Sequence, residues 1–242
     1  MKIIEKIRKR NDDAHGNPMP TIVMFGSSST EGCFEVYTDD NGKIITVRDR
    51  KHSIHRNLSD MLFELYPYAD VTFVNSGIAG DTTEGAIKRL ERDVISKNPD
   101  LVIMSIGGND CTEHGISKLE EYAENLRYII SEIKKTGAEI IFWTPYAMCT
   151  RVKTELTDPL LRDIAAKVAD AANSGIYDLY IERAKSVASE CGAKVCDIRK
   201  IWNVMRENGV DTDRLLSNHI NHATREFNKV IAYNVLQVML GE

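Results

Sequence analysis

The sequence predicts an α/β fold, a three-layer α/β/α sandwich with a central, mostly parallel five-stranded sheet. Short apolar runs rich in Val or Ile are bounded by Gly, Asn, Asp or Pro, as buried parallel strands are. Amphipathic helical patterns separate these runs, and such alternation is typical of a parallel sheet covered by helices on both faces. The five predicted strands are Thr21–Phe25, Val71–Asn75, Leu101–Ile106, Glu139–Trp143 and Lys194–Asp197.

The predicted helices carry apolar residues at helical spacing. Residues 1–20 are expected to form an N-terminal helix and extension, and Ile87, Leu90 and Val94 share one face of a later helix. A longer helix and a closing helix follow the same spacing. Their apolar positions are Leu119, Tyr122, Leu126, Ile129, Ile130 and Ile133, then Phe227, Val230, Ile231, Val235, Val238 and Met239.

One segment, residues 34–49, departs from this alternation. It consists of two extended pieces around Asp40-Asn41-Gly42, which is a strong β-hairpin signal. The segment follows the loop after the first strand, close to where ligands bind in open α/β sheets. It is therefore either a lid or substrate-contacting flap, or a surface excursion with no part in chemistry.

Size and composition indicate one soluble domain spanning residues 1–242. The apolar fraction of 43% and the charged fraction of 28% are ordinary for a globular chain and exclude disordered, collagen-like and coiled-coil classes. A net charge of −5 argues against a nucleic-acid partner. No run approaches the roughly 18 apolar residues that a membrane span needs.

The cysteines indicate a reducing compartment. The five cysteines (33, 111, 149, 191 and 196) are odd in number, scattered and without a CxxC pair, as in cytoplasmic proteins. The basic stretch Lys6–Arg10 lacks the apolar region of a signal peptide, so a cytoplasmic location is expected. Two His pairs, at 52 and 55 and at 219 and 222, have metal-like spacing but no supporting Cys or carboxylate cluster, so no metal is expected.

Polar and glycine-rich segments follow the predicted strands and precede the closing helix. Because ligands bind at the carboxyl ends of parallel strands, we expect these segments to meet at one edge of the sheet. Together they offer a nucleophile, donors for an oxyanion and a base, which are the groups that acyl transfer requires. The segments are Gly26–Gly32, Asn75–Thr82, Gly107–Asp110 and Asn218–His222.

These segments resemble, in order and spacing, the four motifs of the SGNH (GDSL-type) hydrolase family. The resemblance runs from about Thr21 to the last helix and implies a flavodoxin-like SGNH hydrolase fold. The first motif, Gly-Asp-Ser-x-Thr-x-Gly, is matched by Gly26, Ser28, Thr30 and Gly32; the others by Gly80, by Gly107-Gly108-Asn109-Asp110 and by Asn221-His222.

The resemblance implies a role for each matched residue. Ser28 would be the nucleophile and His222 the general base, while the Ser28 and Gly80 N–H groups and the Asn109 side-chain amide would form the oxyanion hole. Ser27 and Ser29 remain alternative nucleophiles, and His219 is the alternative base. The implied activity is hydrolysis of a small or medium acyl ester, such as an acetylated carbohydrate, without cofactor or metal.

Two positions depart from the family pattern. Ser27 replaces the Asp beside the nucleophile, and the triad Asp expected three or four residues before His222 is absent. The candidates at that position are His219 and Asn218, and Asn218 is the candidate catalytic residue that would orient His222, although a neutral amide cannot stabilise an imidazolium as a carboxylate does. Asp211 and Asp213 lie further upstream as other candidates, and Ala223 takes the place of the family's Pro.

Two other function classes follow from these departures. A catalytically impaired SGNH-fold protein would bind a sugar or acyl ligand without turnover. A phosphate-ligand binder would use the Gly26–Gly32 turn but would leave Asn109 and His222 unexplained. The expected partner is a small-molecule acyl ester; thioesters and lysophospholipids are also family substrates, and the sequence sets no oligomeric state.

Overall fold

A five-stranded sheet forms the centre of the protein. The computed structural model describes residues 1–241, and its central sheet has the strand order β4-β1-β5-β6-β7, with every neighbouring pair parallel. The predicted α/β fold and its five strands are therefore confirmed, with strand ends shifted by a residue or two. The strands are β1 (Thr21–Gly26), β4 (Thr72–Gly77), β5 (Leu101–Ser105), β6 (Glu139–Trp143) and β7 (Lys194–Cys196).

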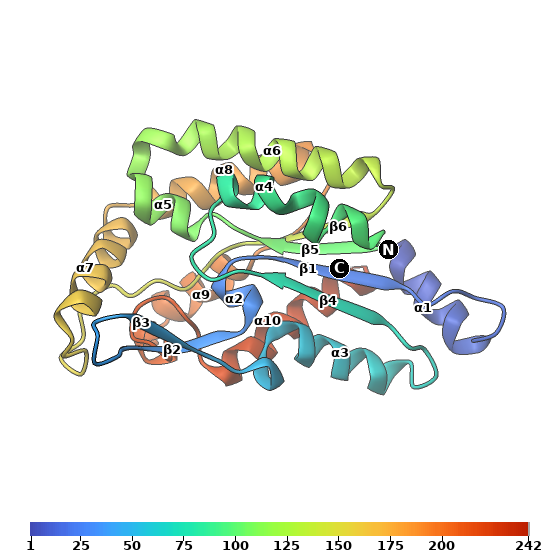
Figure 1. Cartoon of the computed structure of the whole chain (residues 1–242), viewed down its shortest axis with the longest axis horizontal. Coiled ribbons are helices and arrows are strands. Elements are labelled where there is room, and N and C mark those ends of the chain that lie inside the picture. Colours follow the sequence, from blue (N-terminus) through green and yellow to red (C-terminus); the bar gives the residue numbers. More distant parts are fainter. Residues whose placement is uncertain (242) are drawn as a thin grey trace.

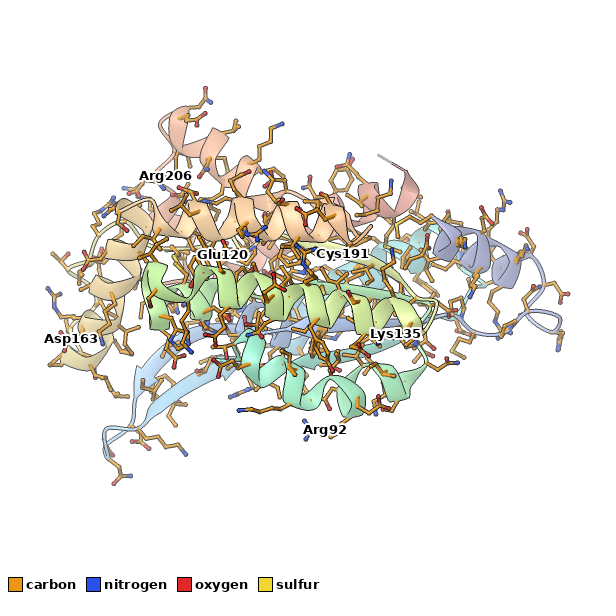
Figure 2. All side chains as sticks on the ribbon, turned by 90° about the horizontal axis from the view of Figure 1, so that it is seen from above. Arg92, Glu120, Lys135, Asp163, Cys191 and Arg206 are labelled. Atoms are coloured by element: carbon orange, nitrogen blue, oxygen red, sulfur yellow. The ribbon has the colours of Figure 1, made fainter. Side chains whose placement is uncertain are left out.

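Helices cover both faces of this sheet (Figure 1). One face carries α4 (Thr83–Asp93), α6 (Leu119–Lys135) and α8 (Ile176–Glu190), and the other carries α3 (Ile54–Leu65) and α10 (Arg225–Leu240). The sandwich forms because each helix has one apolar stripe to bury. In α6 the stripe predicted from the sequence is buried from Tyr122 to Ile133 and half-buried at Leu119, while Glu120 and Lys135 project at the two ends of the helix (Figure 2).

The remaining helices lie around the ends of the sheet. An N-terminal helix, α1 (Lys2–Asp12), buries Ile3 and Ile7, and α9 (Ile198–Glu207) follows β7. At the carboxyl ends of the strands lie α2 (Ser28–Glu31), α5 (Gly108–His114) and α7 (Pro159–Asn173). Short 3₁₀ turns occupy residues 50–52, 95–97, 115–118 and 212–215.

The segment after the first strand forms a separate antiparallel hairpin of β2 (Cys33–Thr38) and β3 (Ile44–Arg48). Its turn is closed by the Gly42 N–H, which donates to the Asp39 carbonyl at 2.9 Å. The hairpin extends beyond the layers of the sandwich in both views (Figures 1 and 2). Near its tip, the Thr38 hydroxyl donates to Asp158, the residue that caps α7.

Two further expectations concern compartment. All five cysteines are free thiols. Within residues 1–241 no helix is both long and apolar enough to span a bilayer. The cytoplasmic location stays a prediction.

Candidate active site

The first motif forms a tight turn between β1 and the one-turn helix α2. Ser28 is the first residue of α2 and is buried. The end of β4 presses against this helix, since a Cβ on Gly77 would overlap backbone atoms of Thr30 and Glu31. The close approach of two strands to α2 fixes where the Ser28 hydroxyl stands.

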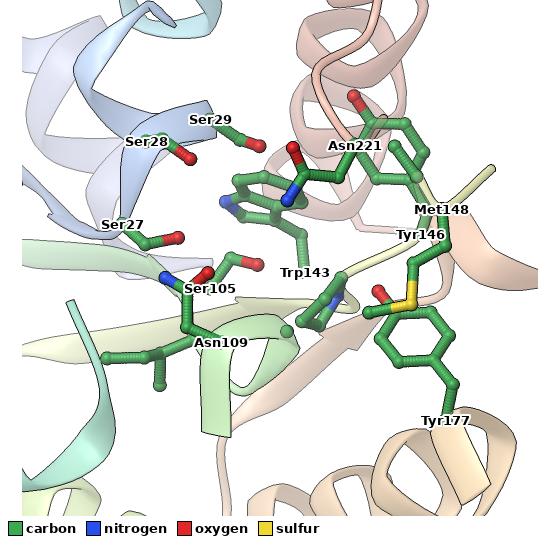
Figure 3. A pocket seen from close by; sticks show the side chains of 14 residues that line it. Ser27, Ser28, Ser29, Ser105, Asn109, Trp143, Tyr146, Met148, Tyr177 and Asn221 are labelled. Carbon is green, nitrogen blue, oxygen red and sulfur yellow. The ribbon is translucent and has the colours of Figure 1, made fainter. Parts of the chain in front are cut away.

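A small cavity of about 40 Å³ opens beside Ser28. The hydroxyls of Ser27, Ser28 and Ser29 approach it from α2 and its entry, and Asn109, Trp143 and Asn221 approach it from three other elements (Figure 3). Its volume corresponds to a few water molecules. The cavity therefore has room for a very short acyl group.

Gly80 lies at a second, wider opening. With a φ of +78° it adopts a left-handed backbone conformation, and a Cβ there would meet nothing within 4 Å. A groove of about 300 Å³ runs past Gly80, and Asn109 and Asn221 line both this groove and the smaller cavity. The two spaces therefore adjoin at these two asparagines.

The carboxylate of Glu31 connects the Gly80 loop to α2. It accepts the Ala79 N–H at 2.7 Å, and it also pairs with Arg48 at the end of β3. Glu31 therefore ties the candidate oxyanion donor at Gly80 to the helix that carries Ser28. The sequence interpretation assigned Glu31 no role, although it stands inside the first motif.

The two residues of the Asn-Asp pair in the third motif have different surroundings and partners. Asn109 faces the cavity, and its Nδ2 donates one hydrogen bond to the Asp81 carbonyl at 2.8 Å, which leaves its second N–H free for a ligand. Asp110 is buried and accepts both the N–H and the hydroxyl of Thr83, at 2.9 and 2.5 Å. Burial raises the pKa of Asp110, and the residue anchors the start of α4.

A buried arginine, Arg89, holds the loop ends together. It donates to the carbonyls of Gly26 and Ser76 at 2.9 and 2.7 Å and pairs with Asp81 at 2.6 Å. Arg89 thus connects β1, β4 and the loop that carries Gly80. The sequence interpretation did not single it out; the signal was an arginine beside Leu90, a residue of the apolar stripe of α4.

His222 is buried and its imidazole binds a main-chain group. Its Nδ1 lies 2.7 Å from the carbonyl oxygen of Phe34, in β2. Because a carbonyl only accepts, Nδ1 must carry the proton, which leaves Nε2 with a free lone pair. Burial lowers the pKa of His222 below its ordinary value, while the Phe34 carbonyl and the charges of Glu31 and Glu35 oppose that shift. The imidazole is therefore neutral near pH 7, as a general base must be.

Asn218 makes no hydrogen bond to that imidazole, so the expectation that it orients the ring in the place of the triad Asp is wrong. Its Oδ1 accepts the backbone N–H groups of Ile220, Asn221 and His222 at 3.0, 2.9 and 2.9 Å, and its Nδ2 donates to the Asn221 side chain. Three backbone donors occupy the oxygen. Asn218 therefore shapes the loop that carries His222.

The other candidates for the third position also have different partners. Asp213 accepts from Thr150 and pairs with Arg151, and Asp211 pairs with Arg151 as well. Within residues 1–241 no carboxylate forms a hydrogen bond to the His222 ring. His219 adopts a φ of +59°. Neither His219 nor His222 is among the residues that line the two spaces, and of the two rings it is that of His222 whose Nδ1 has a hydrogen-bond partner.

Ser28 and His222 are connected through the segment that joins α2 to β2. Phe34 follows Ser28 by six residues and holds Nδ1, and the charge of Glu31, on the Ser28 helix, acts on the imidazole. In the described part of the chain no direct hydrogen bond joins the two side chains; catalytic hydrogen bonds are commonly long before substrate binds. Nor do residues 1–241 gather three or more His, Cys, Asp or Glu side chains as a metal would need.

Comparison with known proteins identifies the family. Residues 24–229 match the family model of the GDSL-like lipase/acylhydrolase family. The chain belongs to this family. The match includes all four motifs, from Gly26 to His222.

Individual relatives are more distant. The chain is 30% identical over 132 residues to an acetylxylan esterase of Geobacillus stearothermophilus, covering 49% of this chain and 58% of that protein. It is 38% identical over 72 residues to an arylesterase of Vibrio mimicus, covering 30% of this chain and 35% of that protein. These matches span less than two thirds of either relative. The crystal structure of a lipase/acylhydrolase from Enterococcus faecalis has the same fold, with a TM-score of 0.66, 24% identity, and coverage of 92% of this chain and 96% of that chain.

Proposed function

We propose that this chain is a serine ester hydrolase that cleaves small acyl esters through an acyl-enzyme formed on Ser28. The observation that carries the proposal is the state of His222: it is buried and neutral, its Nδ1–H is fixed by the Phe34 carbonyl, and its Nε2 is free to accept a proton. A base in that tautomer, packed against the segment that follows Ser28, is what activation of a serine requires.

The reaction proceeds in two halves. Nε2 of His222 takes the Ser28 proton as Oγ attacks the acyl carbon, and the oxyanion is held by the Ser28 N–H, the Gly80 N–H and the free N–H of Asn109. The imidazolium returns the proton to the leaving alcohol. A water molecule, activated by the same nitrogen, then hydrolyses the acyl-enzyme and frees the acid.

The two spaces at the site support a short acyl group and a polar alcohol. The cavity beside Ser28, about 40 Å³, fits an acetyl group, and its serine hydroxyls leave little apolar surface for a longer chain. The adjoining groove of about 300 Å³ has polar groups on Thr112, Glu113 and Lys167, which suit the hydroxyls of a sugar, and apolar surface on Ile164 and Val168, which suits the face of a sugar ring. The similarity to an acetylxylan esterase supports the same assignment.

A fluorophosphonate probe followed by peptide mapping tests the proposal. We expect the probe to modify Ser28 in the wild-type protein, and to react far more slowly when His222→Ala removes the base. Ser27→Ala is the matched control and keeps the labelling. A folded protein that stays unlabelled and releases no acetate from acetylated xylo-oligosaccharides would contradict the assignment.

A second candidate is a protein that binds a sugar or acyl ligand without turnover. It is supported by the neutral partner of His222, since the family's carboxylate at this point is replaced by a carbonyl. It predicts that acetylated oligosaccharides bind to the unlabelled protein in calorimetry and remain intact afterwards.

A further inference from the structure

The hairpin is fastened at its base by one arginine of the last helix. Arg225, at the start of α10, donates to both carboxylate oxygens of Glu35 at 2.5 and 3.0 Å. Its Nε donates to Asp49 at 2.8 Å, just after β3 ends. The guanidinium therefore bridges the first strand of the hairpin and the residue that follows the second.

The same guanidinium covers Phe34. Its central carbon lies 4.3 Å from the centre of the Phe34 ring, and Phe34 is fully buried. Arg225 thus contacts the side chain of Phe34 and also binds the next residue, Glu35. The Phe34 carbonyl, the acceptor for His222 Nδ1, has little freedom to turn away.

The two carboxylates that bind Arg225, those of Glu35 and Asp49, are ionised near pH 7. The bond to Arg225 lowers the pKa of Glu35, and it is also the main cause that lowers the pKa of Asp49 to about 2. Of the charged groups that act on the imidazole, Glu31 belongs to α2 and Glu35 to β2, and both favour the protonated ring. Arg225 neutralises part of the Glu35 charge. The Asp49 carboxylate, which also binds Arg225, lies 2.8 Å from Nδ1 of His52.

From this geometry we propose that Arg225 is a positioning residue for the catalytic base: by clamping Glu35, Asp49 and Phe34 it holds the Phe34 carbonyl against His222. The proposal rests on the proposed function, in which His222 is the base. It also assigns the hairpin a role in the reaction, as the element that carries the partner of the base.

Steady-state kinetics on 4-nitrophenyl acetate test the clamp. Since a shift of about 1 Å in a catalytic group can cost about 10²-fold, we expect Arg225→Met to lower kcat by roughly 10- to 100-fold with little change in KM. Arg225→Lys keeps the charge but loses the two-pronged contact, so its kcat should lie between those of the wild type and Arg225→Met. Arg183→Met is the matched control, because it removes a comparable two-pronged pair with Glu120, between α8 and α6.

The pH profile separates positioning from a loss of packing. Loss of Arg225 lets the Phe34 carbonyl turn away, and because that hydrogen bond raises the pKa of His222 more than the charge of Glu35 does, the rising limb of kcat/KM should move to lower pH. Glu35→Gln removes a negative charge and should move that limb to lower pH. A general loosening would instead hydrate the ring and raise its pKa in both variants.

A third readout does not require turnover. The Nδ1–H of His222 should give a slowly exchanging imidazole N–H signal in NMR, assigned by its absence in His222→Gln. We expect faster exchange in Arg225→Met and no change in Arg183→Met. If the wild type is inactive but this pattern holds, the proposed function fails and the clamp stands. If the wild type is active and Arg225→Met keeps its kcat, its pH profile and a protected signal, the clamp is wrong.

Discussion

The two sides of the site are built from different kinds of contact. On the side of the proposed oxyanion hole, charged side chains make the contacts: Arg89 binds two strand-end carbonyls and Asp81, and Glu31 accepts the Ala79 N–H. On the side of the proposed base, neutral groups bind His222 and its loop directly, the Phe34 carbonyl and the Asn218 amide. On this side the charged groups are Glu31, Glu35 and Arg225, and none of them forms a hydrogen bond to the His222 ring.

This difference shows how two duties of a triad acid can be separated. An Asp hydrogen-bonded to a histidine both orients the ring and stabilises the imidazolium. Here the Phe34 carbonyl orients the ring, while Glu31 and Glu35 supply negative potential from a greater distance. We therefore expect orientation and charge to respond to different mutations.

The largest effect should come from the reacting groups themselves. Ser28→Ala removes the proposed nucleophile, and we expect kcat/KM for 4-nitrophenyl acetate to fall by at least ~10³-fold. His222→Ala should approach the same loss, because the two act as a unit. Full activity in Ser28→Ala would refute the mechanism.

The next largest effect should be on stability, through Arg89. Arg89→Met leaves Asp81 buried without its partner, which typically costs about 3–5 kcal/mol of unfolding free energy. Arg92→Met, on the same helix, removes an arginine whose pair with Asp93 is screened by solvent, so stability should be nearly unchanged (Figure 2). Urea unfolding of the two variants measures the difference; equal midpoints would mean that Arg89 does not hold this side together.

Two asparagines give a direct comparison of the two sides. Asn109→Ala removes an oxyanion donor and should lower kcat by about 10²–10³-fold with stability nearly kept. Asn218→Ala leaves three backbone N–H groups of the base loop unpaired and should cost about 1–3 kcal/mol of stability. Steady-state kinetics and thermal unfolding of both variants test this difference. A loss of stability in Asn109→Ala together with a loss of kcat alone in Asn218→Ala would contradict the roles assigned to the two amides.

The smallest effect is a pH dependence of stability. Burial lowers the pKa of His222, and it lowers that of His55 to about 4. In the unfolded chain both rings take up a proton near pH 6.5. Stability should therefore be complete above about pH 6.5 and decrease as the pH falls toward 4. His55→Gln should flatten this decrease in denaturation midpoints measured from pH 7.5 to 4.5; an unchanged slope would assign it to other groups.

The sequence predicted the fold because the five apolar runs and the helix stripes are local patterns. It also located the groups that the structure gathers near Ser28, since these lie in short loops at the carboxyl ends of strands. The partner of His222 could not be predicted from the sequence, because every residue has a main-chain carbonyl and the side chain of Phe34 is apolar. Spacing alone pointed to Asn218, and only the structure shows that its oxygen is already occupied. Asp40-Asn41-Gly42 predicted the hairpin, but not that its base packs against the histidine.

The use of a main-chain oxygen as the partner of His222 has a consequence for mutagenesis and for protein engineering. Every amino acid at position 34 still presents a carbonyl there, so alanine scanning removes no acceptor atom, and an effect of Phe34→Ala would come from the lost contact with Arg225. Exchange of the whole 33–48 hairpin with that of a relative would replace Glu35 as well, and so would change how Arg225 holds that carbonyl in place. Grafts that keep residues 33–35 and 48–49 and vary only the tip should preserve the base.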